Sequence, residues 1–466
     1  MNDMQTNGDY SARRFSGQAT SSSSSSSLVA VAAPASIRRF TKQLVTDSIL
    51  NNAALNAAIK VLPENYNFEI HKTVWRIKQA GAKLVAIQFP EGLLMYACMI
   101  SDILEEFADV EQTFILGDVT YGACCVDDFS ALALGAQFLV HYGHSCLVPV
   151  DVTTLPCMYV FVDISIDIEH LVGTVELNFR PGTRIALAGT IQFSSAIQLA
   201  RHRLSSQFPS LSVPKCKPLS PGEVLGCTAP VIEGAGGREG GVEAIVFVAD
   251  GRFHLEAIMI ANPSIPAFRY DPYARVLTQE YYDQQGMRDV RKRAIETSRS
   301  AKHWGLILGT LGRQGNPHLM DMLKTKLLDK GLETTVFLMS EISPVRLAKI
   351  QGIQAFVQVA CPRLSIDWGE GFALPTLTPY EALVALGDVP GWWEDDYRKE
   401  NSSRSNNKAA SSEDAGGGLA ATTQVSEVVC LIERTSDQLS ARSLSRREEH
   451  GTALGIRSRK HGTATF

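Results

Sequence analysis

Three cysteines occur in settings where a thiol is available for chemistry. Cys124 lies in the glycine-punctuated loop 117–128 after the apolar run 112–116, Cys227 follows Gly226, and Cys361 closely follows the apolar run 355–359. A short apolar run that ends in a polar loop is typical of a buried parallel strand, and open α/β sheets bind ligands at the carboxyl ends of such strands. We therefore predict one metal centre that takes a thiolate from each of three domains.

The remaining cysteines fit a simpler interpretation. A cysteine without a disulfide is commonly a small buried side chain, and we interpret Cys98, Cys146, Cys157, Cys216 and Cys430 in this way. Cys125, next to Cys124, is an alternative ligand at that position. The chain has no C-x-x-C pair, so the spacing indicates neither a zinc finger nor a ferredoxin-type iron-sulfur motif.

Composition excludes several classes of protein. The chain has 466 residues, a net charge of −5 and nine cysteines at irregular spacing. Such cysteine usage is typical of a reducing compartment, and we expect a cytoplasmic protein. No apolar run reaches the roughly 18 residues of a membrane span, and the central region has no basic block for nucleic acid. We therefore expect neither membrane nor direct nucleic-acid binding.

Strands, glycine loops and helices alternate through the centre of the chain. The runs 84–89, 185–193 and 306–315 have a similar order of apolar residues and glycines, and each precedes a helical pattern. This repetition predicts an α/β fold of three similar parallel-sheet domains around a shared metal site. We place the domains at 38–172, 173–300 and 301–395, with disordered tails at 1–37 and 396–466. We also expect helices over 47–62 and 69–80, and a linking helix over 279–302 that ends the second domain.

Polar groups near the predicted strand ends are candidate ligand contacts. Asp250 follows the run 245–248 and could either contact a ligand or cap the next helix. The glycine loop 309–315 resembles a nucleotide-binding loop but lacks the lysine of a P-loop. His141, His144 and His254 also lie near strand ends, where an ordinary hydrogen-bonded histidine is the commoner case.

Several longer motifs resemble the diphthamide synthase family. The resemblance extends over about residues 40–393 and is carried by the segments 65–75, 88–93, 117–128, 141–146, 250–254, 269–273 and 361–368. It implies a three-domain α/β protein with a 4Fe-4S cluster bound by Cys124, Cys227 and Cys361. Three thiolates leave one iron open, and the resemblance implies that S-adenosylmethionine binds there. We expect Gln192, Asp250, Thr310 and Arg313 to contact that co-substrate.

The resemblance also implies an activity and partners. Members of the family use a radical to transfer the 3-amino-3-carboxypropyl group of S-adenosylmethionine to C2 of a histidine in translation elongation factor 2. This is the first step of diphthamide biosynthesis. The three retained ligands imply the catalytic subunit, a transferase that forms a heterodimer with diphthamide biosynthesis protein 2 and receives electrons from a small iron-binding protein. Two alternatives are a noncatalytic metal-binding scaffold subunit and an ordinary methyltransferase, although the latter's glycine fingerprint is not evident.

Overall fold

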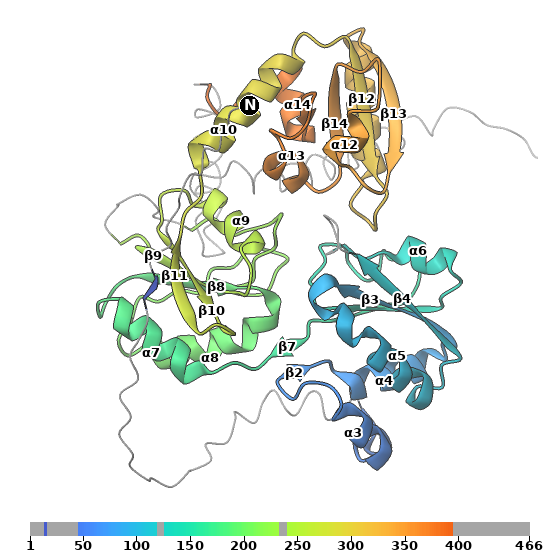
Figure 1. The fold of residues 1–466 in the computed structure, drawn as a ribbon, viewed down its shortest axis with the longest axis vertical. Helices are drawn as coiled ribbons and strands as arrows, with labels where there is room; N and C mark the ends of the chain where they lie inside the picture. Colours follow the sequence, from blue (N-terminus) through green and yellow to red (C-terminus); the bar gives the residue numbers. More distant parts are fainter. Residues whose placement is uncertain (1–13, 16–44, 119–124, 233–239, 395–466) are drawn as a thin grey trace, which may run out of the picture.

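Residues 14–15, 45–118, 125–232 and 240–394 are described by the computed structural model (Figure 1). The described helices and strands form three bodies, each built on one main sheet, and Figure 1 shows them at the corners of a triangle. The mixed α/β architecture with several parallel sheets agrees with the expected fold class. Cys124, the segment 233–239 and nearly all of both tails lie outside the described residues.

The first main sheet has four parallel strands in the order β4-β3-β5-β6. Ile87 and Val140, on its two central strands, are fully buried, as expected for a parallel sheet that is covered on both faces. A helix crosses over between β3 and β4, the usual connection of a parallel pair. The elements are β3 (Leu84–Pro90), α5 (Ala97–Phe107), β4 (Gln112–Asp118), α6 (Asp128–Ala133), β5 (Phe138–Tyr142) and β6 (Cys157–Val160).

Three helices precede this sheet: α2 (Asp47–Leu50), α3 (Ala53–Ile59) and α4 (Ile70–Ala80). The single helix expected over 47–62 is wrong, because the side chain of Asn52 accepts a hydrogen bond from the Leu55 amide and so begins a new helix. The helix α4 ends at Gly81, whose φ of 63° is readily adopted by glycine. Two short strands, β2 (Tyr66–Asn67) and β7 (Asp163–Ile164), pair antiparallel.

The second main sheet is mixed, which corrects the expectation of three wholly parallel sheets. Its strands β8, β9 and β10 are parallel, but β11 and β1 run antiparallel to their neighbours. The elements are β1 (Arg14–Phe15), α7 (Ile168–Asn178), β8 (Ile185–Gly189), α8 (Ser194–Leu204), β9 (Ala244–Val248), α9 (Phe253–Ala261), β10 (Ala267–Asp271) and β11 (Val276–Glu280).

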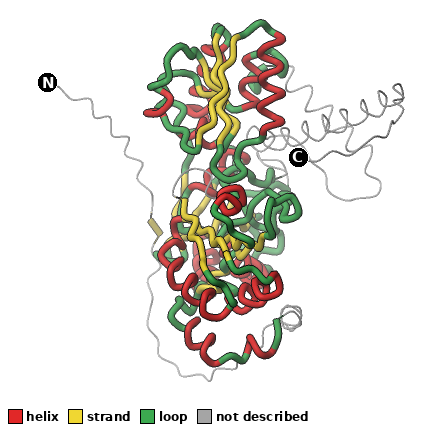
Figure 2. The backbone as a smooth tube through the Cα atoms, turned by 90° about the vertical axis from the view of Figure 1, so that its right-hand side faces the viewer, coloured by secondary structure: helices red, strands yellow, loops and turns green. Residues whose placement is uncertain are grey.

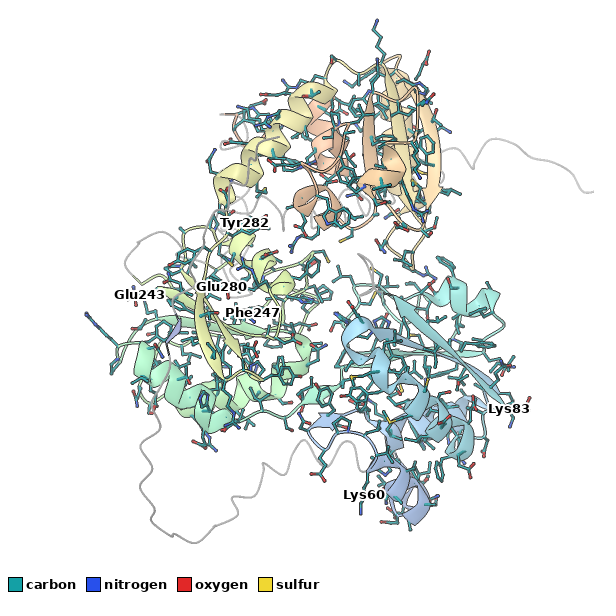
Figure 3. The ribbon with its side chains drawn as sticks, viewed as in Figure 1. Lys60, Lys83, Glu243, Phe247, Glu280 and Tyr282 are labelled. Atoms are coloured by element: carbon teal, nitrogen blue, oxygen red, sulfur yellow. The ribbon has the colours of Figure 1, made fainter. Side chains whose placement is uncertain are left out.

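The linking helix is shorter than expected because its predicted start is occupied by β11. Pairing with β10 outweighs the helical preference of residues 279–280, and α10 (Gln284–Ser298) begins after Asp283, which caps it. Figure 3 labels Tyr282 at the passage from β11 to α10. This helix packs on the third sheet, where Ile295 shares a core with Trp304, which corrects the expectation that the helix ends the second domain.

The third main sheet is fully parallel, in the order β13-β12-β14-β15. Figure 2 shows the strands of this body between helices on either side, which explains why its central strands are buried. The elements are β12 (His303–Gly309), α11 (Pro317–Asp329), β13 (Glu333–Met339), α12 (Pro344–Leu347), β14 (Ala355–Val359), α13 (Arg363–Asp367), β15 (Thr376–Leu377) and α14 (Pro379–Ala385). No described helix is long and apolar enough to cross a membrane.

In all three sheets, a side chain just before one strand accepts hydrogen bonds from backbone amides at the start of the neighbouring strand. Gln137, just before β5, accepts hydrogen bonds from the amides of Lys83 and Leu84 at 2.7 and 3.3 Å. Gln354, just before β14, accepts from the two amides at the start of β12 in the same way. Glu243, just before β9, accepts from the amide of Arg184 at 2.9 Å. The repetition inferred from the sequence is therefore visible in equivalent hydrogen bonds between a side chain and the backbone of the neighbouring strand.

Candidate metal centre

The first thiol-bearing loop is anchored by a buried glutamine. Gln88, on β3, donates its amide to the carbonyl of Cys125 at 2.9 Å and accepts from the backbone amide of Asp127 at 3.0 Å. Its oxygen also lies 3.0 Å from Nδ1 of His141, on the neighbouring strand. Gln88 is 4% exposed, so water cannot easily replace these bonds. The described chain thus resumes after Cys124 in a fixed position at the carboxyl end of the sheet.

Cys146 has a more specific environment than a packed core thiol. Its sulfur accepts hydrogen bonds from the amides of Val126 and Val148, each at 3.4 Å. A hydrogen bond from the Cys125 thiol, together with these amides, lowers the pKa of Cys146 despite its burial. Burial has the opposite effect on Cys157, whose pKa it raises to about 12. Cys146 therefore supports the backbone that follows Cys124, whereas Cys157 behaves as the expected buried thiol.

The second thiol lies in a tight turn. The amides and carbonyls of Leu225 and Thr228 bond to each other across Gly226 and Cys227, at 2.9 and 3.3 Å. A side chain on Gly226 would overlap the ring of Phe253 at the start of α9, so only glycine fits this approach. Cys227 is half-buried, and its sulfur lies 3.7 Å from the hydroxyl of Thr228. The turn presents this thiol near the carboxyl ends of β8 and β9.

The third thiol follows β14. Gln358, which is fully buried on that strand, donates to the carbonyl of Cys361 at 3.0 Å and lies 3.1 Å from the hydroxyl of Ser365. This repeats the role of Gln88 in the first sheet, where a strand glutamine also binds the carbonyl of a loop cysteine. Cys361 itself is half-buried just before α13. Strand-borne amides therefore orient two of the three cysteine loops.

Contacts between the bodies bring these loops together. Arg363, two residues after Cys361, donates to the carbonyls of Phe253 and Gly226 at 2.8 and 3.4 Å. Arg313, in the glycine loop after β12, forms two hydrogen bonds with Asp128, at 2.7 and 2.6 Å. The third body thus contacts the Cys227 turn through one arginine and the segment after Cys124 through another.

The first and second bodies also meet at this edge. Gln192 donates to the carbonyl of Gly143, and the rings of His144 and His254 lie 5.7 Å apart. Burial lowers the pKa of His144 to about 4 and that of His254 to about 3. Both imidazoles are therefore neutral near pH 7, which limits charge repulsion of any cation bound nearby.

The four expected co-substrate contacts differ in what they bind. Arg313 and Gln192 lie at the junctions of the bodies, where Asp128 and the Gly143 carbonyl engage them. Asp250 and Thr310 are exposed at strand ends. The Asp250 carbonyl accepts from Arg269 at 2.9 Å, and α9 begins after Arg252 without a cap from Asp250. The structure brings Gln192 and Arg313 to inter-body contacts and leaves the side chains of the other two accessible.

The residues present fit a thiolate-bound metal group. Cys227 and Cys361 lie on adjoining loops joined by Arg363, and thiolates are the ligands that iron-sulfur clusters use. Within the described ranges, which omit Cys124, no three His, Cys, Asp or Glu side chains are grouped as a metal site. Cys124 lies outside the described residues, so the three-thiolate site stays a prediction, of which the structure describes the loops of Cys227 and Cys361.

Sequence reasoning missed the residues that hold these loops. Gln88, Asp128, Gln358 and Arg363 lie inside or beside the motifs that carry the family resemblance, but the sequence alone predicts no role for them. Their roles depend on partners that are distant in the sequence, such as Asp128 for Arg313, 185 residues away. The one local signal was a polar residue within an otherwise apolar strand, which applies to Gln88 and Gln358.

Comparison with known proteins identifies the family. A family model described as "Putative diphthamide synthesis protein" matches residues 89–398. The chain is 58% identical over 347 residues to 2-(3-amino-3-carboxypropyl)histidine synthase subunit 1 of Mus musculus, covering 74% of this chain and 77% of the relative. It is 54% identical over 349 residues to the protein of that name in Dictyostelium discoideum, covering 74% of each.

A solved structure has the same fold. The crystal structure of Dph2 from Pyrococcus horikoshii matches with a TM-score of 0.55 and 27% identity, covering 69% of this chain and 91% of that one. A second structure of that protein, with a 4Fe-4S cluster, matches equally well and covers 70% of this chain and 92% of that one. With the family model and the close curated relatives, these likenesses show that the chain belongs to the diphthamide synthesis protein family.

Proposed function

We propose that this protein is the catalytic subunit that transfers the 3-amino-3-carboxypropyl group of S-adenosylmethionine to C2 of a histidine imidazole in translation elongation factor 2. The observation that carries the proposal is the meeting of three cysteine-bearing sheet edges. Arg363 joins the loops of Cys227 and Cys361, and Arg313 joins the same body to the segment after Cys124. The names of the curated relatives support a synthase of this type.

The proposed ligands of a 4Fe-4S cluster are Cys124, Cys227 and Cys361. Support comes from the cluster in the similar Dph2 structure and from the engagement of Cys125 elsewhere. The thiol of Cys125 bonds to Cys146, and its carbonyl accepts from Gln88. Both contacts engage Cys125 with side chains of the first body, which supports Cys124 rather than Cys125 as the proposed ligand.

Three protein ligands leave one iron open to a co-substrate. Once bound, a reduced 4Fe-4S cluster would supply the single electron that cleaves S-adenosylmethionine into 5′-methylthioadenosine and a 3-amino-3-carboxypropyl radical. Two features of nearby loops support this assignment: His144 and His254 are uncharged near pH 7, which suits a positively charged sulfonium, and Asp250 and Thr310 are exposed at strand ends. We assign Gln192 and Arg313 to holding the bodies together at this edge.

The proposal extends to partners and organisation. The relatives' name "subunit 1" supports a complex of more than one chain, and we propose a heterodimer with diphthamide biosynthesis protein 2. A small iron-binding protein would supply the electrons in the cytoplasm. We also propose that each main sheet forms the core of one domain, within the bounds 38–172, 173–300 and 301–395, except that α10 packs on the third sheet and belongs to the third domain.

The nucleoside product of the reaction tests the proposed function. An anaerobic assay would contain this protein, its partner subunit, reductant, S-adenosylmethionine and elongation factor 2. We expect 5′-methylthioadenosine, formed only with reductant, and an aminocarboxypropyl group on the factor's histidine. Mass spectrometry distinguishes the alternatives: S-adenosylhomocysteine would indicate a methyltransferase. A cluster-containing protein that forms no product in the complete assay would favour a noncatalytic scaffold subunit.

A further inference from the structure

Two arginines of the third body bind the other two bodies next to the thiol-bearing positions. Arg313 precedes α11, and Arg363 begins α13 directly after the Cys361-Pro362 segment. They reach in different directions, one to the first body and one to the second. Neither contact is needed to complete a sheet, so their position at this edge calls for another explanation.

The guanidinium of Arg363 is fully engaged. The side chain is 1% exposed, and besides the two carbonyls of the second body it bonds to Glu256 at 2.6 Å and Asp367 at 2.8 Å. Its planar group also lies 4.4 Å from the ring centre of Phe253. A planar fork with several donors can satisfy such a set, whereas the single ammonium of lysine cannot. The Arg363 side chain therefore fixes the position of the Gly226-Cys227 turn relative to the Cys361 loop.

Arg313 binds the first body through an ion pair that is largely shielded from solvent. Its partner Asp128 is 0% exposed and also accepts from the amide and hydroxyl of Thr154, at 2.5 and 2.8 Å. The guanidinium lies 4.3 Å from the ring centre of Phe129. The adjacent Gly312, at a φ of 54°, passes so near the first body that a side-chain carbon would lie 3.0 Å from the Val126 carbonyl. The glycine loop and the segment after Cys124 are thus closely packed.

We propose that Arg313 and Arg363 are positioning residues that set the distances between the three thiols. Through these two arginines, the third body fixes the positions of the first and second bodies. The inference rests on the proposed function, because it takes Cys124, Cys227 and Cys361 as ligands of one cluster. Asp128 lies four residues after Cys124, and Gly226 directly precedes Cys227, so each contact acts close to a ligand. Outer contacts of this kind tune the affinity and potential of metal sites.

The test uses Arg313→Lys, Asp128→Asn and Arg363→Lys in the full-length protein, reconstituted anaerobically with iron and sulfide. We expect folded variants that lose iron to a chelator about 10-fold faster or more, as found for outer-shell changes at metal sites. We also expect an altered electron paramagnetic resonance spectrum and midpoint potential of the reduced cluster. Asp128→Asn keeps the shape of the side chain and removes its charge, so it isolates the ion pair.

A matched control separates positioning from stability. Arg291 is as deeply buried as Arg363 and forms two hydrogen bonds with Glu381, at 2.8 and 2.7 Å. It also donates to the carbonyls of Ser365 and Thr376, at 2.7 and 2.9 Å, so that all these contacts lie within the third body and none joins two bodies. We expect Arg291→Lys to lower the unfolding temperature without changing the cluster's spectrum or potential. Wild-type spectra, potentials and iron release in the three test variants would overturn the inference. A wild-type protein that binds no iron would overturn it together with the proposed function, and one that holds a cluster but transfers no group would overturn the proposed reaction alone.

Discussion

Buried polar side chains determine the local geometry of the candidate site. His141 is an example: it is 1% exposed, its Nδ1 lies within hydrogen-bond distance of Gln88, and its Nε2 has no hydrogen-bond partner among the described residues. Burial, and secondarily the neighbouring His144, lowers the pKa of His141 from 6.5 to about 3. The neutral ring that results donates from Nδ1 to Gln88, which in turn orients the Cys125 carbonyl.

The folding stability should therefore decrease at acidic pH. Below about pH 6.5 the unfolded chain binds a proton at this imidazole that the folded chain does not, so stability is lost as pH falls toward the folded pKa. At pH 5 the loss is about 2 kcal/mol for His141 alone. Urea unfolding from pH 7.5 to 5 should show a steep loss for the wild type and a shallower one for His141→Gln. The exposed His318→Gln is the control; parallel curves for wild type and His141→Gln would contradict the assignment.

Gly226 is a second residue whose identity the packing requires. In Gly226→Ala the new methyl group would displace the ring of Phe253, on which the guanidinium of Arg363 stacks. We expect a loss of about 1–3 kcal/mol in unfolding free energy, as for other overpacked sites, together with reduced iron retention. Gly173→Ala, on α7, has open space around it and should be neutral or stabilising. Unchanged iron content in Gly226→Ala would show that the turn tolerates the shift.

At the scale of elements, the two ends of the third main sheet have different roles. At the amino end of the third sheet, Gln354 connects two strands, because it accepts hydrogen bonds from the amides of Lys302 and His303. The carboxyl end has Gln358, whose amide orients the Cys361 loop. The two glutamines lie four residues apart, at opposite ends of β14. Substituting each one in turn therefore separates the effect on strand pairing from the effect on the loop that carries the thiol.

We expect Gln358→Met to lower stability by about 1 kcal/mol, because the part-buried carbonyl of Cys361 loses its donor. The same variant should release iron faster than the wild type, since the loop that carries Cys361 is no longer fixed. Gln354→Met should lower stability through the opposite end of the sheet and leave iron release unchanged. Equal iron release in the two variants at matched stability would argue against a special role for the carboxyl end.

At the scale of the whole molecule, the proposed site requires the contact of all three bodies. We expect Cys124→Ala, Cys227→Ala and Cys361→Ala each to lose most bound iron after anaerobic reconstitution and to abolish group transfer, because each removes the thiolate of one body. Cys216→Ala should retain iron, since Cys216 precedes Cys227 by eleven residues and its thiol donates to the carbonyl of Lys217. Iron analysis with circular dichroism would check both. A greater loss from Cys125→Ala than from Cys124→Ala would move the first ligand by one residue.

Local sequence determined much of this protein's architecture. The apolar runs and glycines placed β3, β8 and β12 correctly, because strand burial and turn conformation depend on neighbouring residues. The same local reasoning failed at Asn52 and at β11, where a side-chain cap and the pairing with β10 determined the outcome. Only the tertiary structure decided that Arg313 meets Asp128 and that Arg363 meets Gly226, 185 and 137 residues away in the sequence. Such contacts depend on how folded bodies dock, and a single sequence carries no local pattern for the partner of a buried charge.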